Sequence, residues 1–157
     1  MQTLSKKTQY TLRALYSVAR KYGGAPVLIS TLAEEECIPK KFLEQILLGL
    51  KYHGLVDSKR GKGGGYTLLK RPDQITLGSL IRLIDGPLAP LPCASETAYR
   101  KCDECPDART CGTRIVMREV RDATANILDN TTLADVCRRI DSALDEMQTA
   151  EALMYYI

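Results

Sequence analysis

The sequence predicts a mostly α-helical protein with one small two-stranded β-wing, and three observations support this. Apolar residues recur at helical spacing in several segments separated by Gly, Pro or Asn. Two short β-type runs flank a single stretch rich in Gly and Lys/Arg, which is typical of a hairpin. With 157 residues, 45% of them hydrophobic, the chain can form the core of one or two small domains.

Two helices are expected in the first part of the chain. Ser5 or Thr8 caps the first one, and a glycine pair after residue 22 ends it. Its apolar face consists of Leu12, Leu15, Tyr16, Ala19 and Tyr22. A brief second helix follows, capped by Ser30 or Thr31, since Thr31 and Glu34 have the spacing of a capping box.

A third helix begins at Pro39 and runs to about residue 53, where Gly54 ends it. Its apolar positions, which we expect to be buried, are Phe42, Leu43, Ile46, Leu47 and Leu50. Its opposite face presents Lys40, Lys41, Glu44, Gln45 and Lys51. A short helix, a tight turn and an amphipathic helix together predict a helix-turn-helix.

A basic hairpin follows at once. The strand candidates are residues 55–58 and 66–69, joined by residues 59–65, which contain four glycines and three cations. The glycines permit positive φ, and the cations face solvent or phosphate. A helix-turn-helix followed directly by such a hairpin predicts a winged helix.

The second half of the chain is again helical. Thr76 is expected to cap a helix over residues 77–85, which Gly86 and Pro87 end. A long helix spans about 112–128, ended by Asn130, and a last helix is capped by Thr132. The long helix carries a narrow apolar stripe of Val116, Val120, Ala123 and Ile127.

Charge is divided unevenly along the chain. Residues 1–76 carry a net charge of +7 and residues 77–157 a net charge of −4. A basic winged helix predicts binding to double-stranded DNA, with a helix in the major groove and the wing tip at the minor groove. Glu44 and Gln45 are candidates for reading base edges. The expected backbone or minor-groove contacts are Lys40, Lys41, Lys51, Arg60 and Lys62.

The narrow stripe on segment 112–128 needs a partner helix, so we expect a homodimer and an operator with matching two-fold symmetry. No apolar run is long enough to cross a membrane and no signal peptide is evident, so a cytoplasmic protein is expected. There is no Ser/His/Asp arrangement, P-loop or pair of carboxylates. We therefore predict no enzymatic activity.

Four of the six cysteines, Cys93, Cys102, Cys105 and Cys111, lie within nineteen residues, and prolines precede and interrupt this segment. Their thiolates suit an iron–sulfur cluster. They also suit structural zinc, although only one pair has the usual close spacing, or a thiol-disulfide switch. The two remaining cysteines, Cys37 and Cys137, lie on or beside apolar faces and are expected to act as small hydrophobic residues.

The sequence resembles the bacterial IscR/NsrR/RirA-type regulators of the Rrf family. The segments that carry the resemblance are residues 42–46, 54–58, 60–66, the cysteine loop and residues 111–133. This resemblance covers nearly the whole chain. It implies a dimeric winged-helix transcription factor with DNA contacts from Lys41, Glu44, Gln45 and Arg60.

The resemblance also implies cluster ligation by Cys93, Cys105 and Cys111. Two features depart from the family pattern: Arg114 replaces a ligand histidine, and no Asp or Glu precedes Glu34 to act as the acidic ligand that some members take from the partner's first helix. We therefore expect the additional cysteine, Cys102, to supply the fourth ligand of a 2Fe–2S or 4Fe–4S cluster.

The sequence thus predicts a regulator that senses iron–sulfur status, redox stress or nitric oxide. A thiol-disulfide switch and a zinc-stabilised or metal-free repressor of the same fold are the alternatives. The expected divisions are a DNA-binding domain at residues 1–76, a linking helix and cysteine loop at 77–110, and the dimerisation and C-terminal helices at 111–157.

Overall fold

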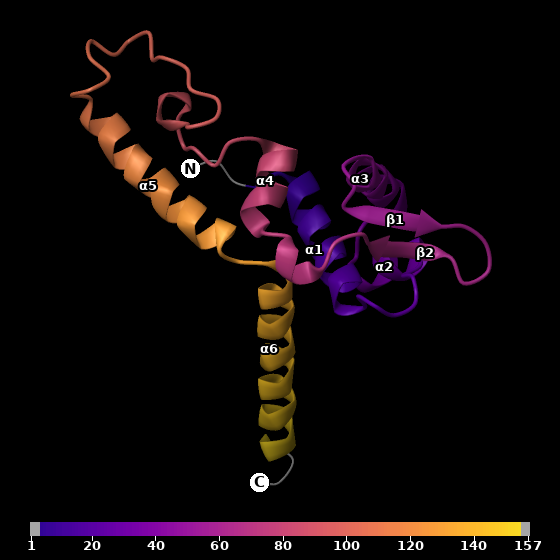
Figure 1. Ribbon diagram of the computed structural model, residues 1–157. Helices are drawn as coiled ribbons and strands as arrows, with labels where there is room; N and C mark the ends of the chain where they lie inside the picture. Colours follow the sequence, from indigo (N-terminus) through magenta and orange to yellow (C-terminus); the bar gives the residue numbers. More distant parts are fainter. Residues whose placement is uncertain (1–3, 155–157) are drawn as a thin grey trace.

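The computed structural model describes residues 4–154, which form six α-helices, two short 3-10 turns and one two-stranded antiparallel sheet (Figure 1). The helices are α1 Lys6–Arg20, α2 Ile29–Glu35, α3 Lys40–Tyr52, α4 Leu77–Asp85, α5 Gly112–Asp129 and α6 Leu133–Met154. The strands are β1 Val56–Lys59 and β2 Gly65–Leu68, and the 3-10 turns are η1 Pro72–Gln74 and η2 Pro92–Ala94. The predicted mostly α fold with a small β-wing is confirmed.

The core lies around α1, which packs against α3, α4, α6 and β2. Leu15 of α1, Leu43 and Leu47 of α3 and Val56 of β1 are completely buried there. Burying a side chain of this size stabilises the fold by roughly 1.5–3 kcal/mol. The winged helix-turn-helix and the first turn of α6 therefore share one core, to which Leu133 contributes.

Three predicted caps are confirmed and one is wrong; the third is Thr132, whose hydroxyl accepts the Asp135 N–H at 3.1 Å at the start of α6. The hydroxyl of Ser5 accepts the Thr8 N–H, and that of Thr76 accepts the Ser79 N–H. The second helix begins earlier than expected: Leu28 precedes it, no side chain caps it, and Ser30 and Thr31 lie within it. Val27 pairs with Tyr66 through two backbone hydrogen bonds of 2.8 and 2.9 Å, so contact with the wing determines where α2 starts.

The wing is the hairpin of β1 and β2, in which Val56 lies opposite Leu68 and Lys59 opposite Gly65. Each strand is shifted by one residue toward the hairpin tip compared with its predicted position. Gly65 passes so close to the backbone of Val27 that any Cβ would overlap it, and its φ of +145° also favours glycine. This glycine therefore joins the wing tightly to the entrance of α2.

Three side-chain predictions are wrong. Phe42 is 39% exposed because it lies at the edge of the core, with its ring edge-on to that of Tyr10. Tyr22 is exposed because α1 ends two residues before it. Cys37 is exposed in the helix-turn-helix turn at a φ of +49°, whereas Cys137 is half-buried and its thiol faces the Tyr16 carbonyl.

Helices α5 and α6 extend away from this body in different directions (Figure 1). α5 carries the cysteine loop, residues 93–111, at its end far from the wing. Its 18 residues correspond to about 27 Å of helix. None of the helices in the described part of the chain is long and apolar enough to span a membrane.

Candidate DNA interface and cysteine pocket

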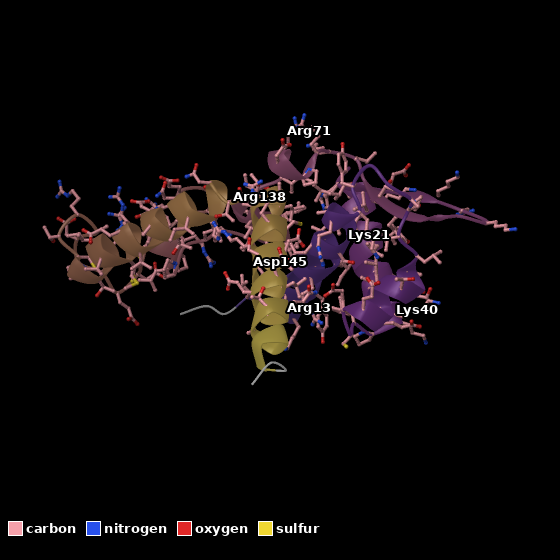
Figure 2. The ribbon with its side chains drawn as sticks, turned by 90° about the horizontal axis from the view of Figure 1, so that it is seen from below. Arg13, Lys21, Lys40, Arg71, Arg138 and Asp145 are labelled. Atoms are coloured by element: carbon pink, nitrogen blue, oxygen red, sulfur yellow. The ribbon has the colours of Figure 1, made fainter. Side chains whose placement is uncertain are left out.

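The exposed face of α3 carries the four residues predicted at its first turns. Lys40, Lys41, Glu44 and Gln45 are all exposed, while Leu43, Ile46, Leu47 and Leu50 face the core. Figure 2 shows Lys40 on the side of the molecule away from α5. The arrangement leaves two cations and the two side chains predicted to read base edges exposed on one helix, which has the size to fit a major groove.

Sequence reasoning missed two residues that continue this face. Leu48 is 63% exposed and Tyr52 is 87% exposed, although both are large and partly apolar. They follow Glu44 at intervals of four residues, the spacing of neighbours on a helix surface. That spacing was a readable signal, and an exposed leucine there is suited to contact a thymine methyl group.

The wing tip presents Arg60 and Lys62 to solvent. Neither forms an ion pair within residues 4–150, whose side chains the structure describes. The Gly64 N–H donates to the Gly61 carbonyl at 2.9 Å, closing a tight turn between them. In Figure 2 the wing extends outward and its tip ends in nitrogen-bearing side chains.

Lys51 occupies a different environment from the other predicted cations. Its ammonium lies 2.7 Å from the Ser58 hydroxyl and 3.1 Å from Asp57 Oδ1, so it joins α3 to β1. A hydrogen bond from the Ser58 backbone, and then the bond from Lys51, lower the pKa of Asp57. A phosphate contact by Lys51 stays a prediction, and it requires the ammonium to be shared with these two partners.

The four clustered cysteines line one pocket of about 320 Å³, the cysteine pocket. Cys102 is exposed, and the other three are partly buried. The remaining walls include Leu91, Glu104, Pro106, Ala108, Thr113 and Arg114. The fold therefore places Cys93 beside three thiols that are 9 to 18 positions away in sequence.

Cys105 and Cys111 line this pocket together, and each shifts the pKa of the other. Cys111 directly precedes α5. The backbone N–H of Arg114 and the neighbouring Cys105 thiol lower the pKa of the Cys111 thiol. The neighbouring Cys111 thiol in turn raises the pKa of the Cys105 thiol. The helix start thus favours a thiolate at Cys111, as a helix dipole does.

A set of four thiolates suits a structural zinc ion and also suits an iron–sulfur cluster. Within residues 4–150, no three His, Cys, Asp or Glu side chains are grouped closely enough to surround one metal ion. Structural zinc needs four ligands around one centre at about 2.3 Å. A two-iron cluster takes two thiolates on each iron and a four-iron cluster takes one, so four sulfurs around a wider pocket also suit a cluster.

Two arginines of α5 contact the backbone of the cysteine loop. Arg114 Nε donates to the Cys93 carbonyl at 2.8 Å, and Arg121 donates to the Ala94 carbonyl at 2.6 Å. Arg121 was missed by sequence reasoning, because an arginine in an amphipathic helix indicates a solvated face. Only the fold shows that it is buried.

The opposite end of α5 is attached to the winged body. Arg82 of α4 makes a two-pronged ion pair with Asp129, with N–O distances of 2.5 and 2.8 Å. Nearby, the Leu77 N–H donates to the Thr131 carbonyl and the Leu133 N–H to the Ile75 carbonyl, both at 2.9 Å. One helix therefore connects the cysteine loop to the body that carries the recognition helix.

Residues 4–139 match the sequence profile of the Rrf2 family, which is described as an iron-dependent transcriptional regulator. The chain belongs to the Rrf2 family. Members of this family are transcriptional regulators that bind DNA and act as dimers. The predicted family, and the prediction that the protein is not an enzyme, are thereby confirmed.

Two named relatives of this Rrf2-family chain are HTH-type transcriptional regulators. An rrf2-like HTH-type regulator of Rhodobacter capsulatus is 42% identical over 136 residues, covering 85% of this chain and 91% of its own length. CymR of Bacillus subtilis is 35% identical over 154 residues, covering 98% of this chain and 99% of its own length.

Solved structures of two such regulators share the fold. CymR, titled the global cysteine regulator of B. subtilis, has a TM-score of 0.74 at 34% identity and covers 88% of this chain and 98% of its own. IscR of T. potens has a TM-score of 0.70 at 28% identity and covers 90% of each chain.

Proposed function

We propose that this Rrf2 regulator is a cytoplasmic homodimer that senses iron–sulfur status, redox stress or nitric oxide through a 2Fe–2S or 4Fe–4S cluster. The ligands would be Cys93, Cys102, Cys105 and Cys111. The observation that carries the proposal is that all four line one pocket at the start of α5. The far end of that helix is attached to the winged body.

The DNA contacts proposed for the winged body follow from its exposed polar residues. Glu44 can accept from cytosine and Gln45 can pair with adenine in the major groove. Lys40, Lys41 and Lys51 would neutralise phosphates, and Arg60 and Lys62 would enter or flank the minor groove. This assigns DNA binding to residues 1–76, with residues 77–110 for sensing and 111–157 for dimerisation.

The dimer would form through α5. Val116 is 51% exposed and Ile127 is 64% exposed, and both belong to the apolar stripe of this helix. A second copy of α5 would remove that stripe from water. A two-fold dimer places two recognition helices in successive major grooves, so the operator would be palindromic.

A bound cluster supplies a redox-active iron centre that oxidants or nitric oxide can destroy, which frees the thiolates. The chain's own residues would convert that change into movement. Cys111 adjoins the first turn of α5, and Arg82, Asp129 and the backbone bonds around Thr131 carry the helix position to the body. A shift of α5 would then change the spacing of the two recognition helices.

The deciding experiment compares DNA binding by anaerobic, cluster-loaded protein with binding by cluster-free protein at one fixed salt concentration. Regulation predicts that the two affinities differ by about 5–150-fold, the usual range of allosteric coupling. Equal affinities would leave the cluster with a structural role only. Brown protein with iron and sulfide in stoichiometric amounts is the first requirement.

A second candidate is a thiol-disulfide switch, which is favoured because Cys102, Cys105 and Cys111 line one pocket and the last two shift each other's pKa. In this reaction Cys102 pairs with Cys105 or Cys111, and an external oxidant accepts two electrons as two protons are lost. The similarity to CymR, titled a global cysteine regulator, supports this candidate. Colourless protein with an oxidant-dependent mobility shift would favour it over the cluster.

Zinc is the third candidate for the pocket, in a repressor that is stabilised rather than switched by its metal. Colourless protein with one tightly held zinc per chain would support it. Colourless protein with neither zinc nor an oxidant response would support a metal-free repressor of the same fold.

A further inference from the structure

The first arm of the cysteine loop, residues 93–96, is attached to α5 by side chains rather than by contacts among its cysteines. Arg114 and Arg121 donate to adjacent carbonyls, those of Cys93 and Ala94, at 2.8 and 2.6 Å. The two arginines are seven residues apart, so they project from the same side of α5 about two turns apart. Together they hold the consecutive peptide carbonyls of Cys93 and Ala94, which belong to the 3-10 turn η2.

Arg121 is the more deeply placed of the two. The residue is 8% exposed, and its guanidinium also pairs with Asp122 and lies 3.5 Å from a Glu96 carboxylate oxygen. A buried guanidinium is costly unless its donors are paired. Ala94, whose carbonyl it contacts, is itself 1% exposed. These mutual contacts give the arm one preferred position against the helix.

Arg114 connects the two arms of the loop. A second guanidinium nitrogen donates to the Ala108 carbonyl at 3.2 Å, on the arm that leads to Cys111. Its planar group also lies 5.8 Å from the centre of the Tyr99 ring. A guanidinium can make these directed contacts at once because its donors form a rigid fork, which a lysine lacks.

We propose that Arg114 and Arg121 are positioning residues that hold the Cys93 arm beside Cys105 and Cys111 before anything binds the thiolates. Bringing Cys93 to the pocket closes a long stretch of chain, which costs conformational entropy. Groups outside the ligand shell that hold ligands in place lower the cost of binding. The role of the cysteines rests on the proposed function, whereas the arginine contacts belong to the metal-free protein.

The test uses reduced, metal-free, full-length protein and limited trypsin digestion. The Arg100 N–H donates to the Pro92 carbonyl at 3.2 Å, beside the held arm, so the rate of cleavage after Arg100 and Lys101 reports the release of this backbone. Losing hydrogen bonds to a charged group should speed this cleavage by about tenfold in Arg121→Gln and in Arg114→Lys. Arg121→Lys keeps one donor for the Ala94 carbonyl and should restore most of the protection.

Arg118→Gln is the matched control, because Arg118 is exposed on the same helix and forms no ion pair or side-chain hydrogen bond within residues 4–150. Its digestion should match the wild type, as should cleavage of every variant in the winged body. Wild-type cleavage rates at Arg100 and Lys101 in both folded arginine variants would overturn the proposal. If Arg121→Gln does not fold, Arg114→Lys decides the question alone.

Iron loading then separates this inference from the proposed function. Faster cleavage in the variants, combined with a wild type that never assembles a cluster, would leave the arginine contacts established and remove the iron–sulfur proposal. Unchanged cleavage in the variants, combined with normal cluster assembly, would remove the positioning role of the arginines and leave the iron–sulfur proposal standing.

Discussion

Cys102 is the residue on which the proposed ligand set depends most. It lines the pocket with the other three cysteines, and its carbonyl accepts the Cys105 N–H at 3.4 Å in a turn. It is also the most accessible of the four. An exposed thiol that faces the same pocket as three half-buried ones is placed to complete a four-thiolate site or to react first with an oxidant.

Replacing Cys102 by Ser tests its role directly. We expect Cys102→Ser, purified without oxygen, to lose most of the visible absorbance of the cluster, because a serine hydroxyl is a poor substitute for a thiolate ligand. Cys37→Ser removes an equally exposed thiol far along the chain and should keep the full absorbance. Unchanged spectrum and stability in Cys102→Ser would show that the fourth ligand is another group.

At the scale of elements, the wing combines a closely packed base with a free tip. Gly65 lies against Val27, and Lys51 ties β1 to α3. Arg60 and Lys62, by contrast, extend from a glycine turn into solvent. The base determines where the wing points, and the tip cations are left to contact an anionic partner.

Removing the tip cations should change the salt dependence of DNA binding. Arg60→Ala and Lys62→Ala are each expected to lower the slope of log K against log salt by about 1, because each removes one phosphate or minor-groove contact. Lys21→Ala removes a cation that is paired with Glu35 on α2, and its slope should equal that of the wild type. Titrations at several salt concentrations measure the slopes, and equal slopes in all three would rule out wing contacts.

The joint between α4 and α5 is the second element-scale feature. Gly78 allows Arg82 to reach Asp129, since a Cβ at residue 78 would overlap the Asp129 carboxylate. The hydrogen bond from Arg82 lowers the pKa of Asp129. The side chains of Arg82 and Asp129 are 34% and 42% exposed, so solvent weakens the attraction between them.

A double-mutant cycle of Arg82→Gln and Asp129→Asn should give a coupling of about 0.5–1 kcal/mol in urea unfolding. Because the folded-state pKa of Asp129 is depressed, this contribution is present above the unfolded pKa of about 4 and is lost as the pH falls through the folded value. Asp129→Asn should therefore reduce the loss of stability at acid pH. A coupling near zero would mean that the backbone bonds around Thr131 hold the joint alone.

At the scale of the whole molecule, the proposed DNA interface and the cysteine loop lie at opposite ends of a branched structure (Figure 1). α5 carries exposed apolar residues between these two ends. A single chain leaves that stripe in water, which soluble folds rarely do over a large area. A dimer through α5 would cover it and would bring the sensing and reading parts of two chains into one assembly.

Sedimentation at micromolar concentration tests this assembly. The wild type is expected to be a dimer, and Val116→Glu and Ile127→Glu are expected to be monomers, because each places a charge at the centre of an apolar interface. Glu119→Gln changes an already polar, exposed position of the same helix and should stay dimeric. A monomeric wild type would remove the α5 dimer, and dimeric Glu variants would place the interface elsewhere.

Features that depend on neighbouring residues in the chain were predictable. The fourth helix spans 77–85 and the fifth begins at Gly112, both as predicted, because caps and helix-ending glycines act within a few residues. The wing was displaced by a single residue in each strand. The gathering of the four cysteines could be expected from their short separation, and the structure places them in one pocket.

The sequence by itself therefore determined the winged helix-turn-helix, the family and the candidate residues, since periodicity, capping and motif spacing are local properties. Only the tertiary structure decided that α2 starts at Ile29, that Phe42 is exposed and that Lys51 is paired. The burial of Arg121 against the Ala94 carbonyl belongs to the same group. Each depends on a partner distant in sequence, and local patterns do not specify which distant groups meet.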